Sequence, residues 1–214
     1  MKIQGLQKLT LLDYPGKVAA TVFLGGCNFR CPFCHNAQLV LPARRHEAGE
    51  MSSRELLAFL QKRKGILDGI CITGGEPLME EGAEQLMAAI KELDFALKLD
   101  TNGSYPARLK ALVADGLVDY VAMDIKNAPG KYAMTAGYNK MDISGVCESV
   151  DFLLSGAVDY EFRTTVVREL HTRQDLLDIG KWIRGAKRYF LQTFIDSGDL
   201  VKPSGFSAYC GEDM

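Results

Sequence analysis

The stretch FLGGCNFRCPFCHN, residues 23–36, places Cys27, Cys31 and Cys34 within eight positions. It continues the apolar run VAATVFLGG (18–26), which is typical of a buried strand that ends in glycines. Three thiols at the end of a strand predict a metal site, because soft thiolate sulfur is a ligand for zinc and for iron–sulfur clusters. The number of ligands separates these two kinds of site, since a structural zinc ion normally takes four.

The neighbouring sequence offers two candidates for a fourth ligand, His35 and His46. His35 follows Cys34 directly, and adjacent residues of an extended segment point in opposite directions. His46 lies in the charged stretch ARRHEAGE (43–50), where a solvated side chain is expected. The sequence therefore favours a four-iron, four-sulfur cluster held by three thiolates, with one iron open to a substrate or cofactor. Zinc is the weaker alternative.

Short apolar runs alternate with helical patterns along the chain. The runs predicted as strands are 18–26, 69–75, 95–103, 117–126, 159–167 and 187–194. The segments predicted as helices are 52–63, 82–93, 106–116, 143–156 and 172–185. Consecutive strands that are separated by helices pair in parallel. The pattern predicts an α/β fold, with residues 1–214 forming one domain around a curved sheet or an incomplete barrel.

Glycines and polar residues follow each predicted strand. The strand ends read GGCNFRC (25–31), TGGEP (73–77), DTNGS (100–104), MDIKN (123–127), VVREL (166–170) and QTF (192–194). In (β/α) barrels the catalytic residues gather at the C-terminal ends of the strands. We therefore expect an active site at this edge of the sheet, around the three cysteines.

The composition is ordinary for a globular protein, with 47% apolar and 24% charged residues in a chain of 214. The formal net charge of −2 gives no reason to expect a nucleic-acid partner. The N-terminus has no secretion-type apolar segment and no run is long enough for a membrane span, so we expect a cytoplasmic location and no membrane contact. Of the scattered cysteines, Cys71 is expected to be a buried hydrophobe, and the role of Cys210 stays open.

The C-x3-C-x2-C spacing, with an aromatic Phe33 before the third cysteine and GGEP (74–77) at the end of the next strand, resembles the radical S-adenosylmethionine (radical SAM) superfamily. The resemblance implies a partial (β/α)6 barrel, with S-adenosylmethionine bound to the open iron through its amino and carboxylate groups. One electron from the cluster would cleave this cofactor to methionine and a 5′-deoxyadenosyl radical, and the radical would abstract a hydrogen atom.

The resemblance also assigns roles to residues near the cofactor. Gly74, Gly75 and Glu76 match the segment that meets the methionine amino group, and a carboxylate complements an ammonium. Phe33 matches the position near the adenine, and Lys126 the position that meets the cofactor carboxylate. Taken alone, GGEP also fits an ordinary strand-to-helix turn.

Further positions match the DTNG and D-x-K segments of the glycyl-radical activating enzymes within this superfamily. Thr101 and Asn102 are expected beside the cofactor. A monovalent-cation site is implied at Asp100, Thr101, Asp124 and the backbone carbonyl of Ala122, because oxygen ligands suit hard cations. Arg163 matches a basic position near the cofactor, and its strand offers no carboxylate partner on the same face. Alone, Asp124 and Lys126 also fit a surface ion pair.

The opening GLQKLTLLDYPGKVAATVFLGGCNFRCPFCHN (5–36) is similar to the activating proteins of anaerobic ribonucleoside-triphosphate reductases. This implies a glycyl-radical enzyme as partner and a flavodoxin or ferredoxin as reductant. Residues 1–16 are expected to be an N-terminal extension, and 195–214 a C-terminal tail that is truncated or divergent. Three alternatives stay open: a pyruvate formate-lyase type partner, a small-molecule substrate as in 7-carboxy-7-deazaguanine synthases, and a non-catalytic iron–sulfur or zinc protein.

Overall fold

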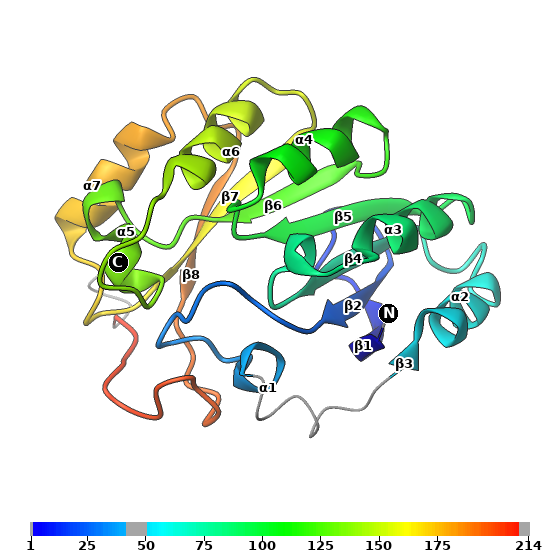
Figure 1. Cartoon of the computed structure of the whole chain (residues 1–214), viewed down its shortest axis with the longest axis horizontal. Helices are drawn as coiled ribbons and strands as arrows, with labels where there is room; N and C mark the ends of the chain where they lie inside the picture. The colour runs from blue at the N-terminus through cyan, green and yellow to red at the C-terminus, as the bar shows by residue number, and fades with distance from the viewer. Residues whose placement is uncertain (1, 42–50, 210–214) are drawn as a thin grey trace.

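The computed structural model of the protein describes residues 2–41 and 51–209, and these form one curved sheet with helices on its outer side (Figure 1). The strands are β1 (Lys2–Thr10), β2 (Ala19–Leu24), β3 (Met51–Ser52), β4 (Gly69–Gly74), β5 (Ala96–Thr101), β6 (Tyr120–Asp124), β7 (Asp159–Val166) and β8 (Tyr189–Thr193). Their order across the sheet is β3-β1-β2-β4-β5-β6-β7-β8, with β3 and β8 at the two edges. Strands β2 and β4 to β8 are all parallel, and the sheet does not close. This arrangement confirms the predicted partial (β/α)6 barrel.

Helices lie between the strands along the chain, and the longer ones cover the outer face of the sheet (Figure 1). They are α1 (Ala37–Val40), α2 (Ser53–Gln61), α3 (Ala83–Lys91), α4 (Pro106–Ala114), α5 (Tyr132–Thr135), α6 (Ser144–Leu154) and α7 (Arg173–Trp182), with two short 3₁₀ helices at Pro77–Met79 and Pro129–Lys131. Capping boxes start α2 at Ser52 and α7 at Thr172, and α4 begins with Pro106. Every helix and strand predicted from the sequence is present, and the observed ends are shorter by one to three residues.

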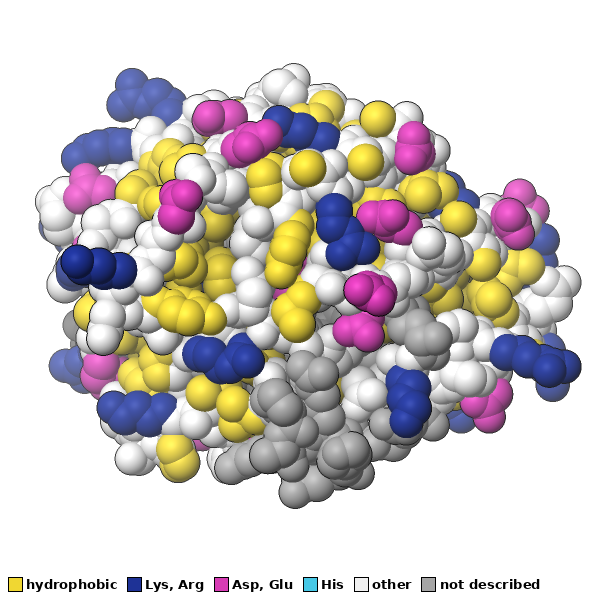
Figure 2. Space-filling model, in the orientation of Figure 1, with side chains coloured by type: hydrophobic (Ala, Val, Ile, Leu, Met, Phe, Trp, Pro, Cys, Tyr) yellow, Lys and Arg dark blue, Asp and Glu magenta, His cyan; other side chains and the backbone are white. Residues whose placement is uncertain are grey.

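The strands in the middle of the sheet are almost entirely buried, as parallel strands covered on both faces should be. On the outside, acidic and basic side chains are interspersed over the face that Figure 2 shows. No helix within residues 2–41 and 51–209 is both long enough and apolar enough to cross a bilayer.

The segment expected to be an N-terminal extension contributes a strand to the sheet. Residues Lys2–Thr10 form β1, which pairs antiparallel with β2 and widens the sheet on the side of the first parallel strand. Its register with β2 shifts twice, between Ile3 and Gly5 and again between Gln7 and Thr10. These irregularities, together with five polar or charged residues among nine, explain why no strand pattern was visible in the sequence.

The segment after β8 crosses the loop that carries the three cysteines. The amide of Val201 donates to the carbonyl of Cys34 (3.1 Å), and the amide of Lys202 donates to that of Pro32 (2.9 Å). The side chain of Leu200 is buried in the core beside them. The described part of the tail, 195–209, is therefore part of the wall around the cysteine loop. His46 and Cys210 lie outside the described residues.

Candidate active site

A cavity of about 310 Å³ opens at the C-terminal ends of the parallel strands. Most of the residues predicted for the site line this cavity. They are Cys27, Cys31, Phe33, Cys34, Gly74, Gly75, Asp100, Thr101, Asn102, Asp124, Lys126 and Arg163. The structure thus brings the cysteine loop, the glycine pair and the two polar strand ends to one place. Glu76 and Ala122 were also predicted for the site and do not line it.

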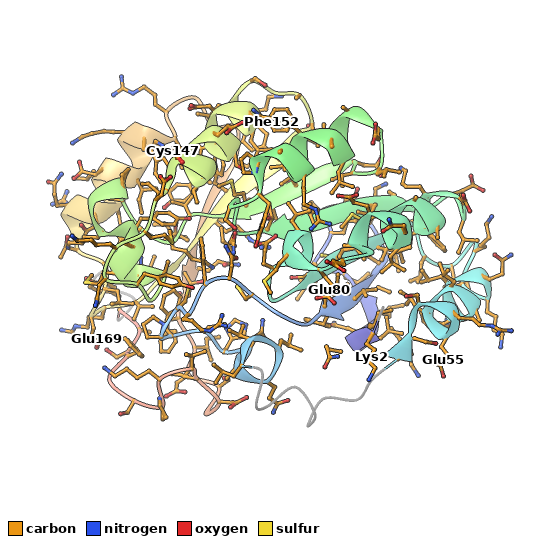
Figure 3. All side chains as sticks on the ribbon, in the orientation of Figure 1. Lys2, Glu55, Glu80, Cys147, Phe152 and Glu169 are labelled. Atoms are coloured by element: carbon orange, nitrogen blue, oxygen red, sulfur yellow. The ribbon has the colours of Figure 1, made fainter. Side chains whose placement is uncertain are left out.

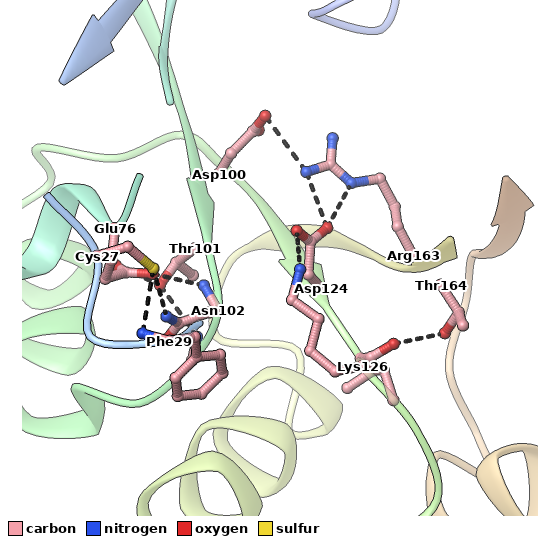
Figure 4. Close-up of polar contacts among 12 residues, drawn as sticks. Cys27, Phe29, Glu76, Asp100, Thr101, Asn102, Asp124, Lys126, Arg163 and Thr164 are labelled. Atoms are coloured by element: carbon pink, nitrogen blue, oxygen red, sulfur yellow. Dashed lines mark hydrogen bonds and ion pairs between the residues drawn. The ribbon is translucent and has the colours of Figure 1, made fainter. Parts of the chain in front are cut away.

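The cysteine loop leaves β2 and turns back on itself above the cavity. The amide of Cys34 donates to the carbonyl of Cys31 (3.0 Å), and Nη1 of Arg30 donates to the carbonyls of Cys27 (2.5 Å) and Phe29 (2.7 Å). The Sγ of Cys27 accepts a hydrogen bond from the amide of Phe29 at 3.3 Å. A longer one comes from Nδ2 of Asn102 at 3.9 Å (Figure 4). Hydrogen bonds of this type to sulfur ligands tune iron–sulfur centres.

The three thiols suit a metal cluster better than acid–base or nucleophilic chemistry. All three are free, and burial raises the pKa of Cys27 to about 11 and that of Cys31 to about 12. Burial also raises the pKa of Cys34. A thiol with such a pKa is a poor nucleophile at neutral pH, whereas a coordinated metal deprotonates its thiol ligand. Within the described part of the chain, no three His, Cys, Asp or Glu side chains lie close enough to hold a single metal ion.

The glycine pair at the end of β4 allows the backbones of β2 and β4 to approach each other closely. Gly74 has a φ of +127°, which other residues rarely adopt. A Cβ atom on Gly75 would overlap the carbonyl oxygen of Gly26. The same carbonyl accepts a hydrogen bond from the amide of Glu76 at 2.7 Å. The pair thus presents bare backbone to the cavity directly beside the cysteine loop.

The side chain of Glu76 is held by three hydrogen bonds and does not line the cavity, and its expected contact with a bound ammonium stays a prediction. Its Oε1 accepts from the amide of Leu78 (3.0 Å) and the hydroxyl of Thr101 (2.9 Å), and its Oε2 accepts from the amide of Asn102 (2.7 Å). The carboxylate is fully buried and joins the ends of β4 and β5. Its role in the structure is therefore to fix the positions of Thr101 and Asn102.

Burial raises the pKa of Glu76 to about 7 from 4.5, although its three hydrogen bonds oppose the rise. Between these pH values the native state binds more protons at this position than the unfolded state, so the contribution of Glu76 to the free energy of unfolding decreases as pH rises. We expect a decrease of up to about 3 kcal/mol that levels off above pH 7. Denaturant titration of the apoprotein from pH 5 to 8 measures it, and the Glu76→Gln variant should lack this component. Parallel pH profiles for the two proteins would contradict the assignment.

An alternating chain of charges crosses the base of the cavity. The Nζ of Lys126 lies 2.9 Å from Asp124, and the Nη2 of Arg163 lies 3.2 Å from Asp124 and 3.3 Å from Asp100 (Figure 4). Asp100 also forms an ion pair with Lys98, which is almost fully buried. Burial would raise the pKa of Asp124, but Lys126 and Arg163 outweigh this effect and lower it to about 2. Asp124 thus stays ionised between its two cationic partners.

The structure corrects one expectation about this region and bears on a second. Arg163 was expected to have no carboxylate partner on its own strand, but Glu161 on β7 lies 4.0 Å away. Arg163 also pairs with Asp124 on the adjacent β6 and with Asp100 on β5. The cause is register, because Asp124 stands directly opposite Arg163 in the β6–β7 ladder. The monovalent-cation site is affected as well, since the guanidinium of Arg163 lies between Asp100 and Asp124.

The two other members of the predicted cation site are Thr101 and Ala122. The hydroxyl of Thr101 donates to Glu76 and accepts from the amide of Gly103 (3.1 Å). Ala122 stands between Asp100 on β5 and Glu161 on β7 in the sheet. Sequence reasoning had also missed Lys98, whose i, i+2 spacing to Asp100 on a strand is the signal that places both on one face.

The chain is similar to known proteins both in sequence and in fold. The sequence profile of the radical SAM superfamily matches residues 21–183. A protein of Methanocaldococcus jannaschii, named as a candidate glycyl-radical enzyme activating enzyme, is 33% identical over 196 residues, which cover 90% of this chain and 79% of that protein. The 7-carboxy-7-deazaguanine synthase of Methanopyrus kandleri is 31% identical over 130 residues, which cover 53% of this chain and 51% of that protein.

Among solved structures, Streptococcus suis SuiB bound to S-adenosylmethionine has a similar fold, with a TM-score of 0.66. The match covers 88% of this chain and 45% of the SuiB chain, at 12% sequence identity. At that identity the likeness is one of fold. The fold that surrounds the cavity of this chain is thus the fold of a protein crystallised with that cofactor.

Proposed function

Because this chain belongs to the radical SAM superfamily, we propose that it is an activating enzyme that forms a glycyl radical on a partner protein. Radical SAM enzymes use a four-iron, four-sulfur cluster and S-adenosylmethionine, and this chain is such an enzyme. When bound, the two groups supply a 5′-deoxyadenosyl radical that removes a hydrogen atom from the substrate. Cys27, Cys31 and Cys34 are the residues that would hold the cluster.

The cofactor would lie against the charged wall of the cavity. Gly74 and Gly75 would leave backbone groups free to meet its ammonium, and Lys126 would meet its carboxylate from the end of β6. Asn102 would fill the space between this wall and the Sγ of Cys27, because its amide is bonded to both that sulfur and Asn28 (2.9 Å). No side chain is required as an acid or base, so these residues would act by binding, orienting and excluding water.

The observation that carries the proposal of a polypeptide substrate is the charge of the cavity. Of its two Lys and Arg side chains in the described part of the chain, Lys126 pairs with one carboxylate and would meet the cofactor, whereas the charge of Arg163 is offset by two carboxylates. A phosphorylated or carboxylated small molecule would need a cation beyond the one that meets the cofactor carboxylate. The uncharged backbone around a glycine needs none. This favours a polypeptide substrate over the small-molecule alternative.

The cavity also extends toward the side on which the sheet is open. Gln7 on β1 and Gln192 on β8 both line it, and both side chains are exposed. An amide side chain can donate to and accept from a peptide backbone at the same time. We therefore propose that a glycine-containing segment of the partner enters here. We further propose that the partner is an anaerobic ribonucleoside-triphosphate reductase and that the reductant is a flavodoxin or ferredoxin.

The test is to incubate the anaerobically reconstituted protein with S-adenosylmethionine, dithionite and one purified partner at a time. We expect 5′-deoxyadenosine and a glycyl-radical electron paramagnetic resonance signal with anaerobic ribonucleoside-triphosphate reductase. Lys126→Met should reduce both by about tenfold or more, because a charge-assisted contact to the cofactor is lost, whereas the exposed Lys140→Met should not. A radical on pyruvate formate-lyase alone would correct the partner. Cofactor cleavage that depends on a small molecule and on neither partner would overturn the proposal.

A further inference from the structure

The segment that carries Lys126 is held in place by side chains after the strand has ended. Strand β6 stops at Asp124, and the following residues run on as buried, irregular chain. The carbonyl of Ile125 accepts from the hydroxyl of Thr164 (2.8 Å), the contact drawn at the right of Figure 4. The carbonyl of Asp124 accepts from the hydroxyl of Tyr132 (3.3 Å). Buried side chains thus take the role that a neighbouring strand would have in a sheet.

The carbonyl of Lys126 itself is bonded to a buried histidine. Nε2 of His171 lies 2.8 Å from this oxygen, and the His171 side chain has no exposed surface. On the other side of the ring, Nδ1 lies 3.1 Å from the amide nitrogen of Val167, which can only donate. Nδ1 also lies 3.2 Å from the carbonyl oxygen of Val167. The carbonyl of Lys126 can only accept, so Nε2 carries a proton and donates it to Lys126.

A second contact joins the same two segments in the opposite direction. Nδ2 of Asn127 donates to the carbonyl of Leu170 (3.0 Å) and to the hydroxyl of Thr135 (2.9 Å). The carbonyl of His171 accepts in turn from the hydroxyl of Tyr209. The turn 167–171 is therefore fixed on both sides and can act as a rigid support for Lys126.

We propose that His171 is a positioning residue, which sets where the ammonium of Lys126 lies by holding the carbonyl of that residue. The inference rests on the proposed function only in taking the cofactor carboxylate as the group that Lys126 meets. Lys126 is also bonded to Asp124, two residues earlier on the same chain. Movement of its backbone would shift the ammonium relative to both Asp124 and the cofactor. A displacement of about 1 Å is enough to weaken the effect of a group that orients a reactant.

Two substitutions separate the two bonds of the imidazole. His171→Gln places an amide nitrogen near the position of Nε2 and keeps a donor for Lys126. His171→Asn places an acceptor near the position of Nδ1 and keeps the bond from Val167, but has no donor that reaches Lys126. Both remove the ring, so both should lower the melting temperature by similar amounts.

The measurement is the dissociation constant of S-adenosylmethionine on anaerobically reconstituted protein. We expect His171→Gln to bind within about threefold of wild type and His171→Asn to bind at least about tenfold more weakly. Decarboxylated S-adenosylmethionine, used as competitor, lacks the group that Lys126 would meet and should bind all three proteins alike. Equal weakening of both ligands, or no difference between the two variants, would overturn the inference.

A wild-type protein that binds no S-adenosylmethionine would overturn the proposed function and the inference together. A wild type that binds while the variants do not differ would overturn the inference alone. If a variant does not fold, histidine side-chain nitrogen NMR of the wild-type apoprotein decides, since the chain has three histidines. We expect the His171 ring to carry a proton on Nε2. A ring that carries its proton on Nδ1 alone would overturn the assignment.

Discussion

The Cys31→Ala variant is expected to take up less than about a tenth of the iron that the wild type binds after anaerobic reconstitution, and to cleave no S-adenosylmethionine. Cys31 is the most buried of the three clustered thiols and projects into the cavity beside Cys27 and Cys34. Its loss leaves two protein ligands, so two irons of the cluster would lack a protein ligand instead of one. Iron and sulfide analysis and electron paramagnetic resonance of the reduced protein measure the effect.

The control for this variant is Cys147→Ala. Cys147 lies on α6, on the outer side of the sheet and away from the cavity (Figure 3). The Cys147→Ala variant also removes one thiol, and it should leave the iron content unchanged. A Cys31→Ala protein that still holds four irons per chain and responds to the cofactor would show that the cluster ligands have been assigned wrongly.

The Gly75→Ala substitution is expected to have the second largest effect, and it acts on the fold and on the cofactor site together. The added Cβ would overlap the carbonyl of Gly26, and β2 and β4 would have to separate where the cysteine loop begins. We expect the free energy of unfolding to fall by about 3 kcal/mol or more. The separation would also move Cys27, whose Cβ is the next nearest atom, so iron uptake should fall as well.

The matched control is Gly180→Ala, in the middle of α7. A Cβ at Gly180 meets no atom within 4 Å, and alanine is the better helix former. The substitution should therefore raise the free energy of unfolding by about 0.5–1 kcal/mol. Urea titration of both variants gives the comparison. A Gly75→Ala protein as stable as the wild type would mean that the β2–β4 junction relaxes without cost.

The sequence predicted most of the fold because its helices and strands carry strong local signals. Capped and amphipathic helices alternate with apolar runs, and this alternation leaves parallel pairing as the simple solution. Strand β1 carried no such signal, since its register is interrupted twice and its residues are mixed in character. Its place in the sheet comes from pairing with β2, which is a contact between segments and leaves no local pattern.

The candidate site could be predicted as a set of residues but not as a set of contacts. The cysteine spacing and the polar strand ends identify which side chains meet at one edge of the sheet. The partners of Arg163 depend on the register of three strands, and the inward turn of Glu76 depends on donors from two separate loops. His171 is 45 residues from Lys126 along the chain, and no spacing rule connects them. Such contacts exist only once the strands are aligned.

The crossing of the tail over the cysteine loop has a consequence for the order of events during synthesis. The carbonyls of Pro32 and Cys34 find their partners at Val201 and Lys202, which are translated long after the cysteines themselves. On a growing chain the loop is therefore exposed, with its thiols open to oxidation and to stray metal ions, until residues 200–202 have left the ribosome. A cluster inserted before that point would enter a pocket that lacks this part of its wall, so we expect stable insertion to follow the synthesis of residues 200–202.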